Sequence, residues 1–79
     1  YIYYNRGNVH AGRNELSKAI DDYSIAIRID SRLAEAYYNR GLARIKSGNK
    51  QAGIQDLSKA GELGLYDAYS VIKRINKAK

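Results

Sequence analysis

Several residue types are missing from this chain of 79 residues, which has no cysteine, proline, methionine, tryptophan or phenylalanine. Without cysteine the protein can form neither disulfides nor thiolate metal sites, which fits a reducing compartment such as the cytoplasm without identifying one. No stretch approaches the roughly 18 consecutive apolar residues of a membrane-spanning helix, so we expect no membrane span. Because the chain starts at Tyr1 and contains no methionine, we expect it to be a fragment of a longer protein.

Acidic residues are scarce in the second half of the chain, and the net charge is +6. Residues 1–40 carry six basic and five acidic side chains, whereas residues 41–79 carry eight basic and three acidic ones. A basic end of this kind can attract nucleic acid or acidic partners. The more ordinary interpretation is a solvated end that keeps a small protein soluble.

What the sequence does contain is an internal repeat. The string Tyr-Tyr-Asn-Arg-Gly occupies residues 3–7 and again residues 37–41, which is an offset of 34 residues. Such a period is typical of a supersecondary unit that cannot bury its apolar face alone and therefore stacks on copies of itself. The repeat directs the search for function to a binding surface rather than to a catalytic pocket. Four further pairs are identical at the same offset: Ile20 and Ile54, Asp22 and Asp56, Ser24 and Ser58, and Ala26 and Ala60.

We predict an all-α fold of five helices without a strand, because apolar residues recur at helical spacing and no segment alternates with period two. Short turns between consecutive helices make them antiparallel neighbours. Glycines and alanines at equivalent places in both copies indicate close helix crossings, whereas the repeat gives no reason for Gly61. The expected helices cover residues 2–11, 15–29, 33–46, 50–63 and 66–77.

These features resemble the tetratricopeptide repeat, a helix–turn–helix unit of 34 residues. The resemblance implies helix pairs stacked as a short right-handed superhelix, or α-solenoid, with a first repeat at 1–34, a second at 35–64 and a capping helix at 65–79. Polar residues replace some of the family's apolar ones, notably Arg6 and Arg40 for a leucine and His10 and Arg44 for an aromatic residue. Residues that match the family pattern are Tyr3, Gly7, Ala19, Tyr23 and Ala26 in the first copy and Tyr37, Gly41, Gly48, Gly53, Leu57 and Ala60 in the second.

The resemblance also implies a binding face, because the first helix of each pair lines a concave surface that receives an extended peptide or a partner helix. Amides on this surface can bond a peptide backbone, while aromatic and aliphatic side chains supply apolar contact. The alternative is that the same residues only pack against a neighbouring repeat or the cap. The candidate groove residues are Tyr4, Asn5, Asn8, Tyr38, Asn39, Leu42, Ile45 and Lys46.

One subclass of the family grips a C-terminal carboxylate with a clamp of lysines, asparagines and an arginine. Asn8 and Asn39 match two of its positions, but Tyr4, Asp67 and Val71 stand where the cations belong. We therefore infer that the clamp is absent.

We predict no enzyme activity, no cofactor and no metal site. His10 is the only histidine and stands at a core position of the repeat, so it lacks the partners that acid–base chemistry or zinc would need. Asp21 and Asp22 diverge by about 100° on a helix and cannot share a substrate. We expect Asp22 to pair with Lys18 on the helix surface.

The function predicted from the sequence is a non-catalytic scaffold for protein–protein interaction that binds a peptide or partner segment in its concave groove. The alternative is a structural module that self-associates through the open ends of the repeat stack. Eight tyrosines among fourteen basic residues also suggest RNA binding. Tyr3, Tyr23 and Tyr37 are expected in the core, however, which disfavours nucleic acid as the partner.

Overall fold

Five helices form in the computed structural model, which describes residues 1–78. Every predicted helix end lies within one residue of the observed one, and residues 1–78 contain no strand. Asn49 caps the fourth helix, since its side-chain oxygen accepts a hydrogen bond from the backbone N–H of Ala52. The helices are α1 (Ile2–Gly12), α2 (Leu16–Ile29), α3 (Ala34–Lys46), α4 (Lys50–Glu62) and α5 (Asp67–Lys77).

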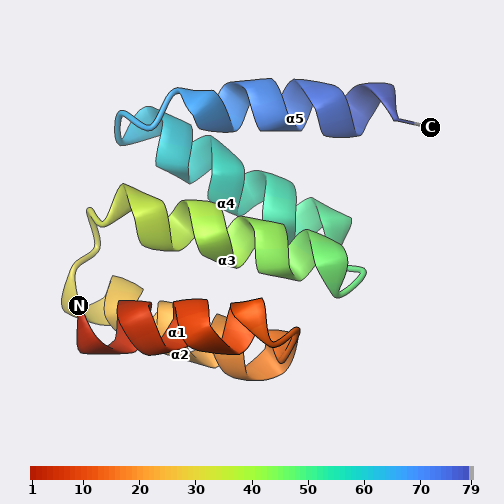
Figure 1. Cartoon of the computed structure of the whole chain (residues 1–79). Coiled ribbons are helices and arrows are strands. Elements are labelled where there is room, and N and C mark those ends of the chain that lie inside the picture. The colour runs from red at the N-terminus through yellow and green to blue at the C-terminus, as the bar shows by residue number, and fades with distance from the viewer. Residues whose placement is uncertain (79) are drawn as a thin grey trace.

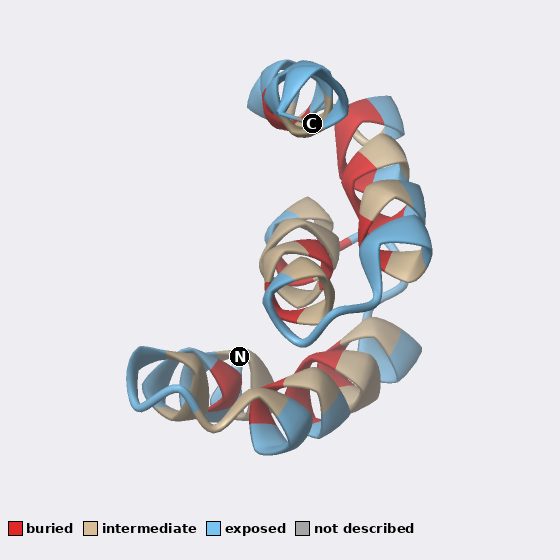
Figure 2. Ribbon diagram, turned by 90° about the vertical axis from the view of Figure 1, so that its right-hand side faces the viewer, coloured by how far each residue is buried: buried red, intermediate tan, exposed pale blue. Residues whose placement is uncertain are grey.

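The helices stack in chain order, from α1 and α2 at one end to α5 at the other (Figure 1). Each helix contacts the next one along the chain, and α1 also contacts α3. In the view turned by 90° (Figure 2), α1, α3 and α5 lie toward one side of the stack and α2 and α4 toward the other. This is the arrangement of a helical-repeat solenoid, in which the first helices of successive pairs share one face. None of the five helices is long and apolar enough to cross a membrane.

The core lies between consecutive helices in two clusters. Ala26, Leu33 and Ala36 form the first, between α2 and α3. The second, between α4 and α5, consists of Leu57, Ala60, Ala68 and Val71. Small side chains dominate both clusters, so the helices can approach each other closely.

Glycines mark the closest approaches. A Cβ atom added to Gly41 would lie 2.8 Å from the carbonyl oxygen of Gly53, so α3 and α4 meet backbone to backbone. Gly61, for which the repeat gave no reason, lies against the ring of Tyr69, and a Cβ atom there would come within 2.5 Å of that ring. Gly61 is thus the place where α5 packs across α4.

An arginine–aspartate pair joins the two helices of each repeat. Arg6 donates from Nε and Nη2 to the two carboxylate oxygens of Asp22, both at 2.8 Å. Arg40 binds Asp56 in the same way, at 2.9 and 2.8 Å. The expected pairing of Asp22 with Lys18 is wrong, because the Asp22 side chain is turned inward and only 4% of the residue is exposed. The arginines that replace the family leucine therefore bind a buried carboxylate instead of packing as an apolar side chain would.

The two pairs differ in the second side chain that faces the aspartate. Arg44 donates from Nη1 to Asp56 at 2.8 Å. His10, at the equivalent position of the first repeat, holds Nε2 at 3.7 Å from Asp22 and Nδ1 at 2.8 Å from the Glu15 carboxylate. Hydrogen bonding to Arg6 lowers the pKa of Asp22, and hydrogen bonding to His10 lowers the pKa of Glu15.

Candidate peptide-binding groove

A groove of about 400 Å³ opens between α1, α3 and α5. Its walls are mostly aliphatic, with two amides at one place and one ammonium group at another. α2 contributes as well, because Leu16 and Tyr23 reach the groove from behind the first-helix face. The lining residues are Asn8, Ala11, Leu16, Tyr23, Asn39, Leu42, Ala43, Ile45, Lys46, Val71 and Ile75.

Five of the eight residues that the sequence pointed to line this groove: Asn8, Asn39, Leu42, Ile45 and Lys46. Four of them come from α3, where positions 39, 42 and 46 recur at the three- and four-residue spacing of a single helix face and Ile45 lies beside them. The structure thus brings α1 and α3 together at the groove, as stacking of the two copies requires.

The other three predicted residues lie elsewhere. Tyr38 packs against the core cluster between α4 and α5. Tyr4 lines a separate hollow and reaches the groove region only through its hydroxyl group. Asn5 is exposed and does not line the groove.

Sequence reasoning missed the contributions of α2 and α5. Val71 and Ile75 form the wall on the α5 side, and Leu16 and Tyr23 belong to α2. Ile75 also packs against the core between α4 and α5, so it serves both the core and the groove. No pattern in the sequence indicates how closely α5 approaches α1, so the sequence could not show that α5 forms a wall of the groove.

A hydrogen-bond network fixes the amides. The Tyr23 hydroxyl donates to Oδ1 of Asn8 at 2.6 Å, and Nδ2 of Asn39 donates to the same oxygen at 3.0 Å. Nδ2 of Asn39 also donates to the hydroxyl oxygen of Tyr4 at 3.1 Å. Burial raises the pKa of Tyr23 to about 12, so its hydroxyl remains a donor throughout the ordinary pH range.

The network leaves one donor group and one acceptor for an outside partner. Within residues 1–78 the hydrogen bonds use Oδ1 of Asn8 and Nδ2 of Asn39. Nδ2 of Asn8 and Oδ1 of Asn39 are the remaining halves of the two amides. A peptide unit offers a C=O group and an N–H group, which are the matching acceptor and donor.

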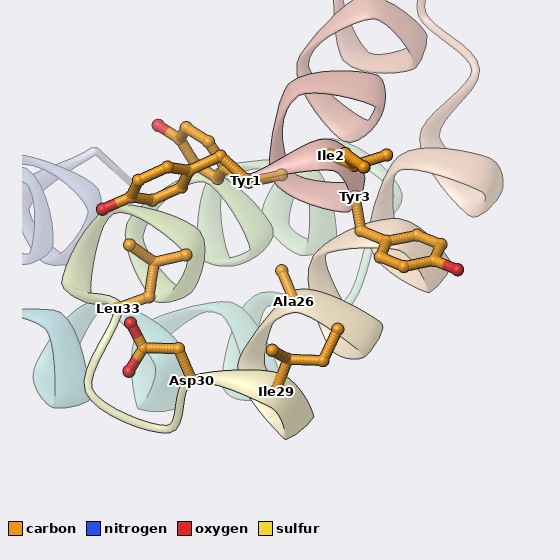
Figure 3. A pocket seen from close by; sticks show the side chains of 8 residues that line it. Tyr1, Ile2, Tyr3, Ala26, Ile29, Asp30 and Leu33 are labelled. Carbon is orange, nitrogen blue, oxygen red and sulfur yellow. The ribbon is translucent and has the colours of Figure 1, made fainter.

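A second hollow, of about 410 Å³, lies at the α1 end of the stack (Figure 3). Ile2, on its rim, is 79% exposed, whereas Ala36 at the equivalent position of the second repeat is fully buried. The difference arises because α2 covers Ala36, and nothing in residues 1–78 covers Ile2 in the same way. The lining residues are Tyr1, Ile2, Tyr3, Tyr4, Ala26, Ile29, Asp30 and Leu33.

Residues 1–78 contain no group of three histidine, cysteine, aspartate or glutamate side chains placed to hold a metal ion. His10, the one histidine, is bonded to Glu15 at the start of α2 and lies outside the groove. The chemistry that the groove itself offers is hydrogen bonding, apolar contact and one positive charge.

The fold defines a class: helical-repeat proteins in which the first helices of successive pairs share one face. A model of the TPR repeat matches residues 7–48, and a model of the tetratricopeptide repeat matches residues 34–63. The first match covers more than half of the chain, which therefore belongs to the tetratricopeptide repeat family. Its five helices are two such repeats followed by a capping helix. No curated protein matches the chain. Proteins of this family act in general as non-catalytic scaffolds for protein–protein interaction.

Proposed function

We propose that this protein binds an extended peptide, or an unstructured segment of a partner protein, in the groove between α1, α3 and α5. The repeats at 1–34 and 35–64 supply the amide face in this proposal, and the segment 65–79 acts as a cap whose helix forms the opposite wall. The observation that carries the proposal is the amide pair of Asn8 and Asn39, held by Tyr23 beside an aliphatic wall.

Pre-organisation supports this use of the amides. Asn8 and Asn39 are already fixed by hydrogen bonds, so a peptide would not have to order them on binding. The groove volume of about 400 Å³ falls within the range of roughly 300–1,000 Å³ that is usual for binding sites. An aliphatic surface with a few placed polar groups is also the usual composition of such sites.

The test uses a displayed library of random 12-residue peptides selected on the wild-type protein. We expect a recovered peptide to bind about tenfold more weakly to Leu42→Ala, which shortens a groove wall, and to Asn8→Asp, which keeps the acceptor for Tyr23 but removes the free donors. Ile29→Ala is the matched control, because Ile29 is an exposed aliphatic residue outside the groove.

Circular dichroism melts of the variants establish that each one folds before affinities are compared. Selection of no peptide would contradict the proposal. So would peptides that bind Leu42→Ala and Asn8→Asp as tightly as wild type, or that are weakened mainly by Ile29→Ala, since the binding site would then be the second hollow.

Self-association through the open α1 end is the second candidate. Ile2 and Val9 are 79% and 52% exposed, while their equivalents Ala36 and Ala43 are buried, Ala36 in the core cluster at the interface between the repeats. The occupant would be a second copy of this chain that extends this repeat interface. Sedimentation velocity over a concentration series would show a dimer that Ile2→Ser with Val9→Ser abolishes, and a monomer at all concentrations would exclude it.

A further inference from the structure

We infer that the groove selects a segment that carries a carboxylate, and that Lys46 binds this carboxylate about three residues away from the peptide unit held by the amides. The inference rests on the proposed function and names the chemistry of its partner. The occupant to which it commits is an acidic, apolar segment of another protein.

Charge is the first argument. Among the residues that line the groove, Lys46 alone carries a charge, and no acidic side chain lines it. Within residues 1–78, no carboxylate lies within ion-pair distance of Lys46, and the residue is exposed at the end of α3. Residues 41–79 also carry five more basic than acidic side chains, so the field around this end of the molecule favours an acidic ligand.

The two buried aspartates of the neighbouring helices α2 and α4 do not compete for Lys46. Asp56 of α4 is buried and bound by Arg40 and Arg44. Asp22 of α2 is likewise buried and bound by Arg6. The ammonium group of Lys46 is therefore available to a carboxylate from outside, and its flexible four-carbon stem lets the pair form clear of the negative end of α3.

The helix sets the spacing. Asn39 and Lys46 lie seven residues apart on α3, which at a rise of 1.5 Å per residue is about 10 Å. An extended peptide advances about 3.3 Å per residue, so it covers that distance in about three residues. Leu42 and Ile45 lie between these two points along α3 and line the same groove. The matching segment therefore has apolar residues between its amide-bound peptide unit and its acidic side chain.

The proposed carboxylate position beside Lys46 is distinct from a position beside the side-chain amides of Asn8 and Asn39. Nδ2 of Asn39 donates both to Oδ1 of Asn8 and to the hydroxyl of Tyr4, so these atoms are already engaged. The single cation stands at the far end of α3. A carboxylate is therefore expected beside Lys46, whether it belongs to an aspartate, a glutamate or a chain end.

The experiment compares selections from the random 12-residue library on three proteins. On wild type we expect recovered peptides to be enriched in aspartate or glutamate next to apolar residues. On Lys46→Glu we expect this enrichment to disappear and lysine or arginine to take its place. Lys59→Glu is the matched control, because Lys59 is an exposed lysine of α4 outside the groove, and it should recover the same acidic peptides as wild type.

Affinity then tests the pair directly. A wild-type peptide should lose about fivefold in affinity when its acidic residue becomes the corresponding amide, because a partly exposed ion pair is worth up to about 1 kcal/mol. On Lys46→Gln the acidic peptide and its amide counterpart should bind equally, which is the signature of a coupled pair in a double-mutant cycle.

The two hypotheses fail in different ways. Recovery of apolar peptides without acidic residues, or of the same acidic peptides on Lys46→Glu, would overturn the carboxylate inference and leave the peptide groove standing. The inference would also be overturned if the change from the acidic peptide to its amide counterpart lowered the affinity for wild type and for Lys46→Gln by the same factor. Failure to recover any peptide on wild type would overturn the proposed function and this inference together.

Discussion

Gly41→Ala gives the sharpest test of how the second repeat is held together. The added Cβ would lie 2.8 Å from the carbonyl oxygen of Gly53 and 3.1 Å from Cγ of Leu57, whereas non-bonded heavy atoms pack best at about 3.5 Å or more. The oxygen belongs to the backbone of α4 and cannot turn aside as a side chain could. The two helices must move apart by several tenths of an ångström, and that movement loosens the packing around Leu57, which is fully buried.

Two contributions of opposite sign set the magnitude. Alanine in a helix interior stabilises by about 1 kcal/mol relative to glycine. Overpacking a tight core costs about 1–3 kcal/mol, and here the neighbour is rigid, so the upper part of that range applies. We therefore expect Gly41→Ala to lower the free energy of unfolding by about 1–2 kcal/mol and Gly41→Leu to lower it further.

Gly12→Ala is the control for this prediction. A Cβ at Gly12 would have no atom within 4 Å, so this variant should show only the helical gain and become slightly more stable. Urea denaturation followed by circular dichroism measures all three variants against wild type. A Gly41→Ala midpoint equal to or above that of wild type would show that α3 and α4 do not meet backbone to backbone.

Two further predictions concern the first repeat and the cap. Asp22→Asn should destabilise the protein at pH 7 by about 1–2 kcal/mol, a range reduced because the partner Arg6 is half exposed. Because Arg6 lowers the pKa of Asp22, the stabilisation from this pair should be complete above about pH 4 and should be lost as the pH falls further. In urea titrations at several pH values, Asp22→Asn should lose part of this acid dependence. Asp21→Asn is the control and should keep it. In the cap, Ile72→Ser with Ile75→Ser should lower the melting temperature strongly, because both side chains pack on the α4–α5 core. Changing the exposed Lys73 and Arg74 to glutamate should alter the melting temperature little. A larger loss from this charge reversal would mean that the two cations are engaged in an acidic contact.

The helices and their order were predictable because they depend on local patterns that occur twice. Apolar spacing, polar turns and the offset of 34 residues set the helix ends to within one residue. Small residues at Gly41 and Gly53 also predicted the close crossing, since a glycine inside a helix costs about 1 kcal/mol and needs a packing reason. Signals of this kind require no knowledge of how distant residues meet.

The arginine–aspartate pairs could have been predicted but were not. Arg6 and Asp22 are 16 residues apart, as are Arg40 and Asp56, and all four positions follow the offset of 34. A polar residue repeated at a core position of one helix calls for a polar partner repeated on the other, because a buried charge without a partner is costly. Reading Arg6 only as a departure from the family pattern hid this pairing.

Groove membership was less predictable because it depends on distances between helices. Tyr38 and Ile45 both pack against the core between α4 and α5, and Ile45 also lies against Gly53. Alanine at both positions would therefore remove core contacts as well as groove surface, and a loss of binding would not identify the site. Asn8 is the more informative position for that purpose, because Asn8→Asp preserves the bond from Tyr23. Leu42 also packs against the core between α4 and α5, so Leu42→Ala is informative only together with its melting curve.

α5 occupies the place of a first helix after α1 and α3, but it carries different side chains, so the two sides of the groove differ. Ala68 is fully buried as Ala36 is, which aligns α5 with α3 at an offset of 32 residues instead of 34. At this offset Val71 takes the position of Asn39, so the amide face ends at α3 and an aliphatic wall follows on α5. A peptide bound in this groove as proposed would meet hydrogen-bonding groups on one side and apolar surface on the other. That difference would fix which edge of an extended segment faces α1 and α3 and which side chains face α5.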